Sequence, residues 1–305
     1  MKSMLIALLA SFMMAAQAQT VTSDELLNAA QAAYEKKNYV EAYQILLPLA
    51  ESGNATAQYK LAGMLQAGLG VAKNGVEAVH WYRKAAEQGN AVAQLNLGSI
   101  LDGGRSVAKN EVEAFQWYRK AAEQGNAIAQ IMTGEMLHRG RGVVKNEVEA
   151  VQWHLKAAEQ GDAHGQFALG MMIKSGAGVA RSEVEAAQWF RKAAEQGNPN
   201  AQYEVGEIYR VGRGISLDYA EAAKWYRLAA NQGFVFAQND LGDMYKVGRG
   251  VSQDYVEAAK WYRLAANQGL PFARHSLGVM YRDGLGVKQD DVEAQKCFDL
   301  ARVRR

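Results

Sequence analysis

The strongest constraint on this 305-residue sequence is a tryptophan that recurs every 36 residues. A fixed period of this length is typical of stacked repeats, in which each unit buries its apolar face only against its neighbours. The sequence therefore predicts a repeat solenoid, whose function should be sought on a surface. All six tryptophans of the chain occupy this register, and the next step of the period reaches Cys297: Trp81, Trp117, Trp153, Trp189, Trp225 and Trp261.

Each repeat contains the signals of two helices joined by a glycine loop. Asn90 can cap a helix that carries Ala93, Leu97 and Leu101 on one face, at the spacing of an amphipathic helix. Six of the seven loops have two glycines two residues apart, which is typical of turns with positive φ. Because these glycines lie between helices and not after a strand, they indicate turns and not phosphate binding.

The second helix of every repeat begins with the pattern of a capping box. Asn74 with Glu77 is the first example, and Asn110, Asn146, Ser182, Asp218, Asp254 and Asp290 each precede a glutamate by three residues. The glutamates are therefore interpreted as structural caps and not as catalytic acids. The buried tryptophans are expected to contribute more to stability than the caps do.

The N-terminus has the features of a signal peptide over residues 1–18. Lys2 precedes an apolar run from Met4 to Met14, and Ala16-Gln17-Ala18 forms a small-x-small cleavage site. This run is shorter than the roughly 20 residues that span a membrane. The mature chain is expected to begin at Gln19 without membrane insertion, and to be exported, periplasmic or alternatively secreted.

The charge and cysteine content of the mature chain limit the kinds of partner and of crosslink to be expected. Without Lys2 it has 33 basic and 32 acidic residues, so nothing in its charge favours nucleic acid. A single cysteine cannot form an intramolecular disulfide. Cys297 is interpreted as an apolar filler at the end of the tryptophan column.

Residues 19–53 are predicted to form a divergent N-terminal helix pair. Thr22 with Glu25 and Asn38 with Glu41 suggest capping boxes, but the glycine loop is missing and Ile45 replaces the tryptophan. Such divergence is typical of terminal repeats. Residues 54–305 then divide into seven repeats: 54–89, 90–125, 126–161, 162–197, 198–233, 234–269 and 270–305.

The pattern A-x-Q-x-x-L-G, then G-x-G-V, then E-A-x-x-W-x-x-K-A-A-E-Q-G-N-A resembles the Sel-1-like repeat, a relative of the tetratricopeptide repeat. The resemblance implies an all-α, right-handed superhelical solenoid of antiparallel helix pairs, with the first helix of each pair on the concave face. It implies an adaptor that binds a protein or peptide, regulates an envelope assembly or takes part in host contact, without enzymatic activity or cofactor. A cysteine-rich branch of the family is linked to β-lactam hydrolysis, but this chain lacks the cysteine pairs of that branch.

The positions that vary between repeats indicate a candidate binding face. Positions equivalent to 56, 60 and 63 share one face of the first helix and change in almost every repeat, so they are expected to face solvent. Aromatic and acidic residues on this face would suit a basic, partly apolar peptide. In the alternative interpretation, the phenylalanines pack between repeats and the acids pair with Arg210 and Lys246. The candidates are Phe236, Phe272, Glu204, Glu207, Asp240 and Asp243.

The sequence contains no recognisable catalytic or metal-binding pattern. Its five histidines occupy five different repeat positions without metal-ligand spacing, and no serine or cysteine has a recognisable base. The alternative function is a cell-envelope protein that binds carbohydrate or acts on peptidoglycan, or a β-lactamase-like hydrolase. For glycoside chemistry, carboxyl groups should converge on one cleft. The sequence leaves the oligomeric state open.

Overall fold

The computed structural model describes residues 22–302, which form sixteen helices and contain no β-strand. The predicted all-helical fold is confirmed. The signal peptide predicted at residues 1–18 lies outside the described residues. The helices are α2 (Ser23–Glu35), α3 (Tyr39–Glu51), α4 (Ala55–Ala67), α5 (Gly75–Glu87), α6 (Ala91–Gly103), α7 (Glu111–Glu123), α8 (Ala127–Arg139), α9 (Glu147–Glu159), α10 (Ala163–Ser175), α11 (Glu183–Glu195), α12 (Pro199–Val211), α13 (Tyr219–Asn231), α14 (Val235–Val247), α15 (Tyr255–Asn267), α16 (Pro271–Asp283) and α17 (Asp291–Arg302).

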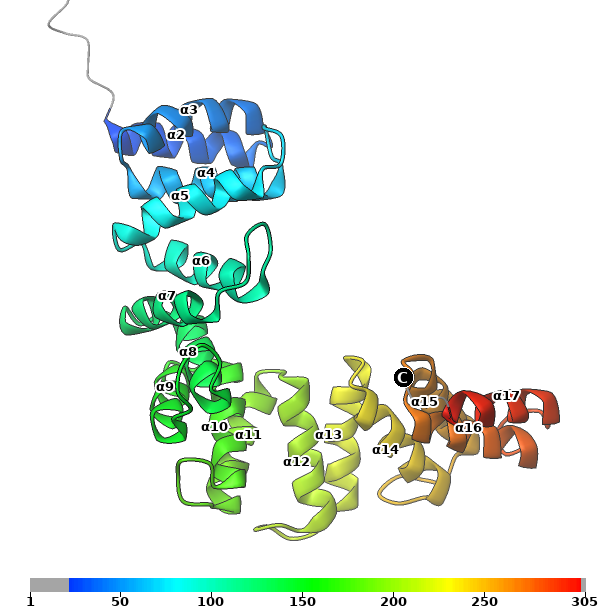
Figure 1. Ribbon diagram of the computed structural model, residues 1–305. Helices are drawn as coiled ribbons and strands as arrows, with labels where there is room; N and C mark the ends of the chain where they lie inside the picture. Colours follow the sequence, from blue (N-terminus) through cyan, green and yellow to red (C-terminus); the bar gives the residue numbers. More distant parts are fainter. Residues whose placement is uncertain (1–21, 303–305) are drawn as a thin grey trace, which may run out of the picture. The chain divides into compact units, whose positions relative to one another are not determined.

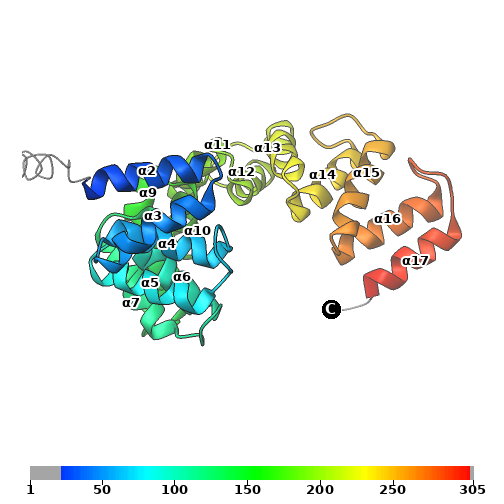
Figure 2. The same cartoon turned by 90° about the horizontal axis from the view of Figure 1, so that it is seen from above.

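Consecutive helices pack as pairs, which recur along the chain (Figure 1). The chain divides into two compact units at Gln124, with α2 to α7 in the first unit and α8 to α17 in the second. Within each unit, the second helix of a pair also packs against the first helix of the next pair, as α5 does on α6 and α13 on α14. In Figure 2, α16 and α17 lie side by side as the last of these pairs. Each unit is therefore a stack in which every pair buries surface against its neighbours.

Two separate reasons favour glycine at the second glycine position of a loop, as Gly250 shows. Gly250 has a φ of 71°, which side chains other than glycine rarely adopt. A Cβ at this position would also lie 2.1 Å from the carbonyl oxygen of Tyr219, where α13 of the preceding pair begins. The loop therefore packs closely on the start of an earlier helix, which fixes the spacing between pairs.

The predicted caps of the second helices are present, but the capping boxes are not closed. The side chain of Asn74 accepts a hydrogen bond from the Glu77 amide at 3.1 Å. The backbone amide of Asn74, which a closed box would offer to Glu77, instead donates to the Leu65 carbonyl of α4 at 2.9 Å. The Glu77 carboxylate therefore accepts from the Asn74 side-chain amide. The box predicted at Asn38 is wrong, because this side chain makes no cap hydrogen bond, whereas the box at Thr22 and Glu25 is complete.

Within each unit, a buried glutamine of the first helix, held by an exposed glutamine at the end of the second helix, joins a pair to the one before it. Gln232, at the end of α13, donates to the Gln202 side chain of α12 at 2.8 Å. Gln202 donates in turn to the Ala194 carbonyl at the end of α11, at 3.2 Å. The last pair departs from this pattern, because Arg274 stands in the place of the glutamine. Its guanidinium donates to the carbonyls of Ala266 and Leu300 and so binds the ends of two helices.

The tryptophan column contributes to the packing of the pairs. Trp81, Trp117, Trp153 and Trp261 are buried, whereas Trp189 and Trp225 are half-buried. Cys297, which continues the column, is buried in a cluster with Tyr262 and Met280. Burial raises the pKa of its thiol, as expected for a side chain that serves packing. None of the helices between residues 22 and 302 is long and apolar enough to span a membrane.

Candidate functional site

Phe236 and Phe272 lie at equivalent positions, each the second residue of a first helix in the second unit. The side chain of Phe236 is 50% exposed and that of Phe272 is 76% exposed. Phe234, just before α14, replaces the usual capping residue and makes no cap hydrogen bond. Its ring packs on Tyr203 at 5.1 Å and on Phe236 at 5.8 Å between centroids. The two exposed rings are therefore placed by ordered helix starts, and Phe236 is supported on one side by other aromatic rings.

Two of the predicted acids lie on α12 and two on α14, and each is already engaged. The Glu204 carboxylate pairs with Lys174 of α10 at 2.6 Å. Glu207 pairs with Arg210 at 2.6 Å and also accepts from the Tyr226 hydroxyl. The alternative interpretation of the sequence, in which acids pair within the fold, therefore holds for Glu207.

The two aspartates accept hydrogen bonds from tyrosines. Tyr203 donates its hydroxyl to Asp240 at 2.9 Å, and Tyr262 donates to Asp243 at 2.5 Å. The predicted partner of Asp243 was Lys246, and the structure gives it this tyrosine instead. Asp240 is half-buried, whereas Asp243 is exposed, and its second oxygen accepts a long hydrogen bond from the Asn239 side-chain amide at 3.4 Å.

The surroundings of Asp240 and Glu207 shift the pKa values of these two carboxyl groups in opposite directions. Burial raises the pKa of Asp240, although hydrogen bonds from Asn239 and Tyr203 oppose this shift. Burial also disfavours the Glu207 carboxylate, but the hydrogen bonds from Arg210 and Tyr226 outweigh it and lower its pKa. Glu207 is therefore the more firmly ionised of the two.

Three cavities follow this face of the second unit. The smallest, of about 170 Å³, is lined by Lys174, Glu204 and Glu207. The next, of about 430 Å³, is lined by Glu207, Asp240 and Asp243. Glu207 borders both cavities, and Tyr203 does so as well, so the hollows are neighbours along α12. We refer to the face that contains Tyr203 and the six predicted residues as the acidic-aromatic surface.

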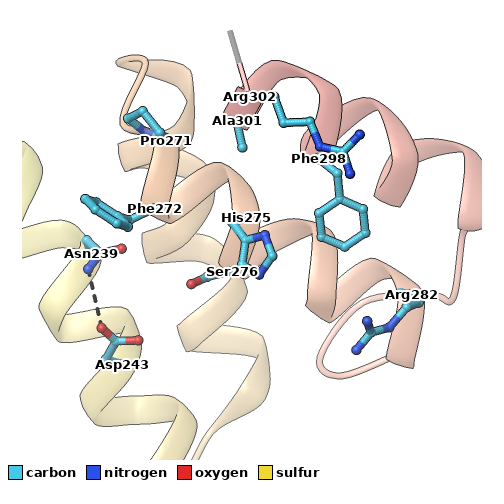
Figure 3. Close-up of a pocket in the computed structure, with 10 residues that line it drawn as sticks. All are labelled: Asn239, Asp243, Pro271, Phe272, His275, Ser276, Arg282, Phe298, Ala301 and Arg302. Carbon is cyan, nitrogen blue, oxygen red and sulfur yellow. Dashed lines mark hydrogen bonds between the residues drawn. The ribbon is translucent and has the colours of Figure 1, made fainter. Parts of the chain in front are cut away.

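The third cavity, of about 810 Å³, lies beside Asp243 at the C-terminal end of the same surface (Figure 3). Phe272 forms one wall of this cavity, and Phe298 of α17 forms the other, with His275 between them. Arg282 and Arg302 also line it, and both have carboxylate neighbours, Asp283 and Asp299. This volume lies in the range of ligand pockets, and its lining combines apolar rings with a few polar groups.

Sequence reasoning missed the tyrosines of the site, although a signal for them exists. In the fifth and sixth repeats, residues 19 apart on the two helices of a pair are both polar and hydrogen-bonded: Tyr226 donates to Glu207, and Tyr262 donates to Asp243. In the fourth repeat the equivalent residues are Phe190 and Met171, and both are apolar. The tyrosine at this position packs against the first helix of its pair, and its hydroxyl group also holds an acid of the variable face.

No group of three potential metal ligands among residues 22–302 is placed to hold an ion. The polar groups of the acidic-aromatic surface are suited to hydrogen bonding with a peptide or protein. The stacked helix pairs and this surface together define a helical-repeat interaction scaffold.

The chain belongs to the Sel1 repeat family, whose model matches seven consecutive segments: 55–90, 91–126, 127–162, 163–198, 199–234, 235–270 and 271–302. Sel1 repeat proteins generally mediate protein–protein interaction, and the fold is typically a non-catalytic scaffold.

Two solved structures are similar to this chain over most of its length. A Sel1 repeat protein from Oxalobacter formigenes is 36% identical, with a TM-score of 0.73, and the match covers 79% of this chain and 96% of that one. A protective antigen present in uropathogenic Escherichia coli strains is 31% identical, with a TM-score of 0.63, and the match covers 93% of this chain and 69% of that one. No curated protein matches the sequence.

Proposed function

We propose that this protein is an exported adaptor that binds a peptide or protein segment on the acidic-aromatic surface. The observation that carries the proposal is the exposure of Phe236 and Phe272 on two adjacent first helices. Exposed aromatic rings are costly to leave in water and are enriched among residues that dominate binding energy. Because short helices hold both rings, little conformational freedom is lost when a partner covers them.

The ligand should combine apolar side chains with a basic one. Asp243 is exposed and borders both larger cavities, so a lysine or arginine of the ligand can reach its carboxylate. Glu204 and Glu207 already have cationic partners, and the surface is therefore less acidic than the sequence predicts. Apolar contacts should accordingly supply most of the affinity, with Asp243 setting orientation.

Photocrosslinking from the two phenylalanine positions tests this surface. Benzoylphenylalanine placed at 236 and at 272 should capture the same protein in intact cells. The matched control is position 228, because Leu228 is 47% exposed on α13, a second helix. The captured protein, once purified, should bind the Phe236→Ala/Phe272→Ala variant at least about tenfold more weakly, a loss of about 1.4 kcal/mol. Equal capture from all three positions, or equal affinity for the double variant, would reject this binding surface.

Export rests on the signal peptide predicted at residues 1–18 and has its own test. Mass spectrometry of the protein purified from the periplasmic fraction should find Gln19 as the first residue. A cytoplasmic protein that retains Met1 would contradict export without affecting the binding surface.

A carbohydrate-directed function is a second candidate because Glu207 and Asp240 line one cavity with opposite pKa shifts. Two carboxyl groups whose pKa values are shifted apart can act as the general acid and the general base of one reaction. Both carboxylates already accept hydrogen bonds from tyrosine, which argues for a structural role. Release of soluble fragments from purified peptidoglycan, abolished in Glu207→Gln, would favour this candidate, and no release would reject hydrolysis.

A further inference from the structure

A separate cavity of about 230 Å³ lies in the first unit, between α2, α3 and α4. These three helices are the blue and cyan segments at the start of the chain in Figure 1. Tyr34 and Tyr59 contribute aromatic rings, Met64 and Leu46 contribute apolar groups, and Lys60 is the only charged residue of the lining. The cavity shares no residue with the acidic-aromatic surface.

Gly63 leaves this cavity open, although the fold does not require a glycine at this position. Its φ lies outside the positive region, and a Cβ would meet only the Tyr82 hydroxyl, at an ordinary contact distance of 3.7 Å. Glycine within a helix destabilises it relative to residues with side chains. The six later repeats carry larger residues here: Ser99, Glu135, Met171, Glu207, Asp243 and Val279. The missing side chain therefore makes room for something other than the packing of the repeat.

Lys60 gives the cavity a cationic edge. Its ammonium donates to the Gln31 side chain at 2.6 Å and has no ion-pair partner among residues 22–302. Gln31 donates in turn to Glu35 at 2.8 Å, so the Gln31 side chain stands between the ammonium and this carboxylate. In the fifth and sixth repeats, the positions of Lys60 and Gly63 are all acidic. The same helix face thus carries opposite charges in the two units.

The aromatic walls have room for one apolar side chain. Tyr34 is 40% exposed, and its ring packs edge-on against Tyr39 at 5.1 Å between centroids. Tyr59 packs against Tyr82 at 6.1 Å. Both rings are therefore supported from behind, and an aromatic or aliphatic group inserted between them would be covered by ordered walls.

From this arrangement we infer that the first unit contains a second ligand site, which takes an apolar side chain flanked by carboxylates from an acidic peptide segment. The apolar side chain fills the space above Gly63. A neighbouring carboxylate replaces Gln31 as the partner of the Lys60 ammonium, since a charge-assisted hydrogen bond is stronger than one to a neutral amide. This inference does not depend on the proposed function of the acidic-aromatic surface.

Three fluorescein-labelled peptides test the inference by fluorescence anisotropy with the full chain. The peptides are Gly-Asp-Phe-Asp-Gly, its basic counterpart Gly-Lys-Phe-Lys-Gly, and Gly-Asp-Ala-Asp-Gly, which lacks the ring. The acidic phenylalanine peptide should bind at least about tenfold more tightly than either of the other two. Equal binding of the acidic and basic peptides would overturn the charge preference, and equal binding of the alanine peptide would overturn the pocket.

Gly63→Met fills the cavity with the residue that the fourth repeat carries at this position. The variant should melt at a temperature no lower than the unmodified protein and lose at least about tenfold in affinity for the acidic peptide. Unchanged affinity would reject the site. If Gly63→Met melts at a lower temperature, the Lys60→Gln variant tests the site instead. It should reduce the preference for the acidic over the basic peptide to less than about threefold, and an unchanged preference would reject the site. Leu228→Ala, at an exposed position of α13 in the second unit that belongs to neither site, is the control and should leave this binding unchanged.

Discussion

Ser106 and Gly75 share one space, because a Cβ built on Gly75 would lie 2.0 Å from the Ser106 hydroxyl oxygen and 2.6 Å from its Cβ. Ser106 occupies the second glycine position of the loop and has a positive φ of 67°. Gly75 opens α5, where other second helices open with larger residues such as Glu147 or Tyr219. The loop of the second repeat thus carries the Ser106 side chain, and the first repeat has a glycine, Gly75, at the point where this side chain packs.

Gly75→Ala should destabilise the first unit, because the new methyl group meets Ser106. Overpacking of this kind costs about 1 to 3 kcal/mol. The double variant Gly75→Ala/Ser106→Gly removes both the clash and the strained φ, and it should recover the loss. Thermal melting of the single and double variants measures this coupling. Additive effects of the two substitutions would show that the residues do not compete for space.

Trp153→Ala should lower stability far more than Asn146→Ala on the same helix. Trp153 is buried, and truncation of a buried tryptophan costs roughly 3 to 5 kcal/mol. Asn146 caps α9 through the Glu149 amide, and the loss of a cap costs about 1 kcal/mol. Denaturant midpoints of the two variants provide the comparison. Equal midpoints would mean that the tryptophan column does not hold the stack.

His154 should make the second unit sensitive to acid. Burial and the nearby His138 lower its pKa from 6.5 to about 4, so the folded protein resists protonation while the unfolded chain does not. The stability that the neutral imidazole provides is complete above about pH 6.5 and is lost as the pH falls toward 4. The loss should reach the order of 2 to 3 kcal/mol.

His154→Phe tests this pH dependence, because Phe190 occupies the equivalent position and packs on Gly170 as His154 packs on Gly134. Melting temperatures at pH 7 and pH 4.5 should differ less for the variant than for the unmodified protein. The same difference in both proteins would assign the acid sensitivity to other groups.

Arg274→Gln should loosen the end of α17 while leaving the preceding pair intact. Glutamine can still reach the Ala266 carbonyl, as its counterparts do in earlier repeats, but it cannot also bind the Leu300 carbonyl. Hydrogen exchange should accelerate for the last turn of α17, and α13 should keep its protection. Unchanged exchange in α17 would show that packing alone holds this helix.

Much of the fold could be predicted from the sequence because it depends on local rules. The 36-residue period, the capping residues and the loop glycines each act within a few residues, and they placed the helix pairs correctly. The variable face was also recognisable, and its two phenylalanines are exposed as expected. The capping boxes predicted for the second helices of the seven repeats are not closed, because the backbone amide that each box needs bonds to the preceding helix, whereas the box at Thr22 and Glu25 is complete.

The roles of the acids and the cavities depended on side chains that meet only in the folded stack. Lys174 and Glu204 are 30 residues apart in the sequence, and they form an ion pair in the structure. The sequence alone does not show this pair, and the Glu204 carboxylate was therefore predicted to be available to a ligand. The space above Gly63 likewise exists only because α2 and α3 supply its other walls. The sequence by itself determined the repeat, its helices and the face on which it varies, since these follow from periodicity and backbone preference. Only the tertiary structure decided which polar groups on that face are already satisfied and where it is hollow, because both depend on distances between residues of different helices.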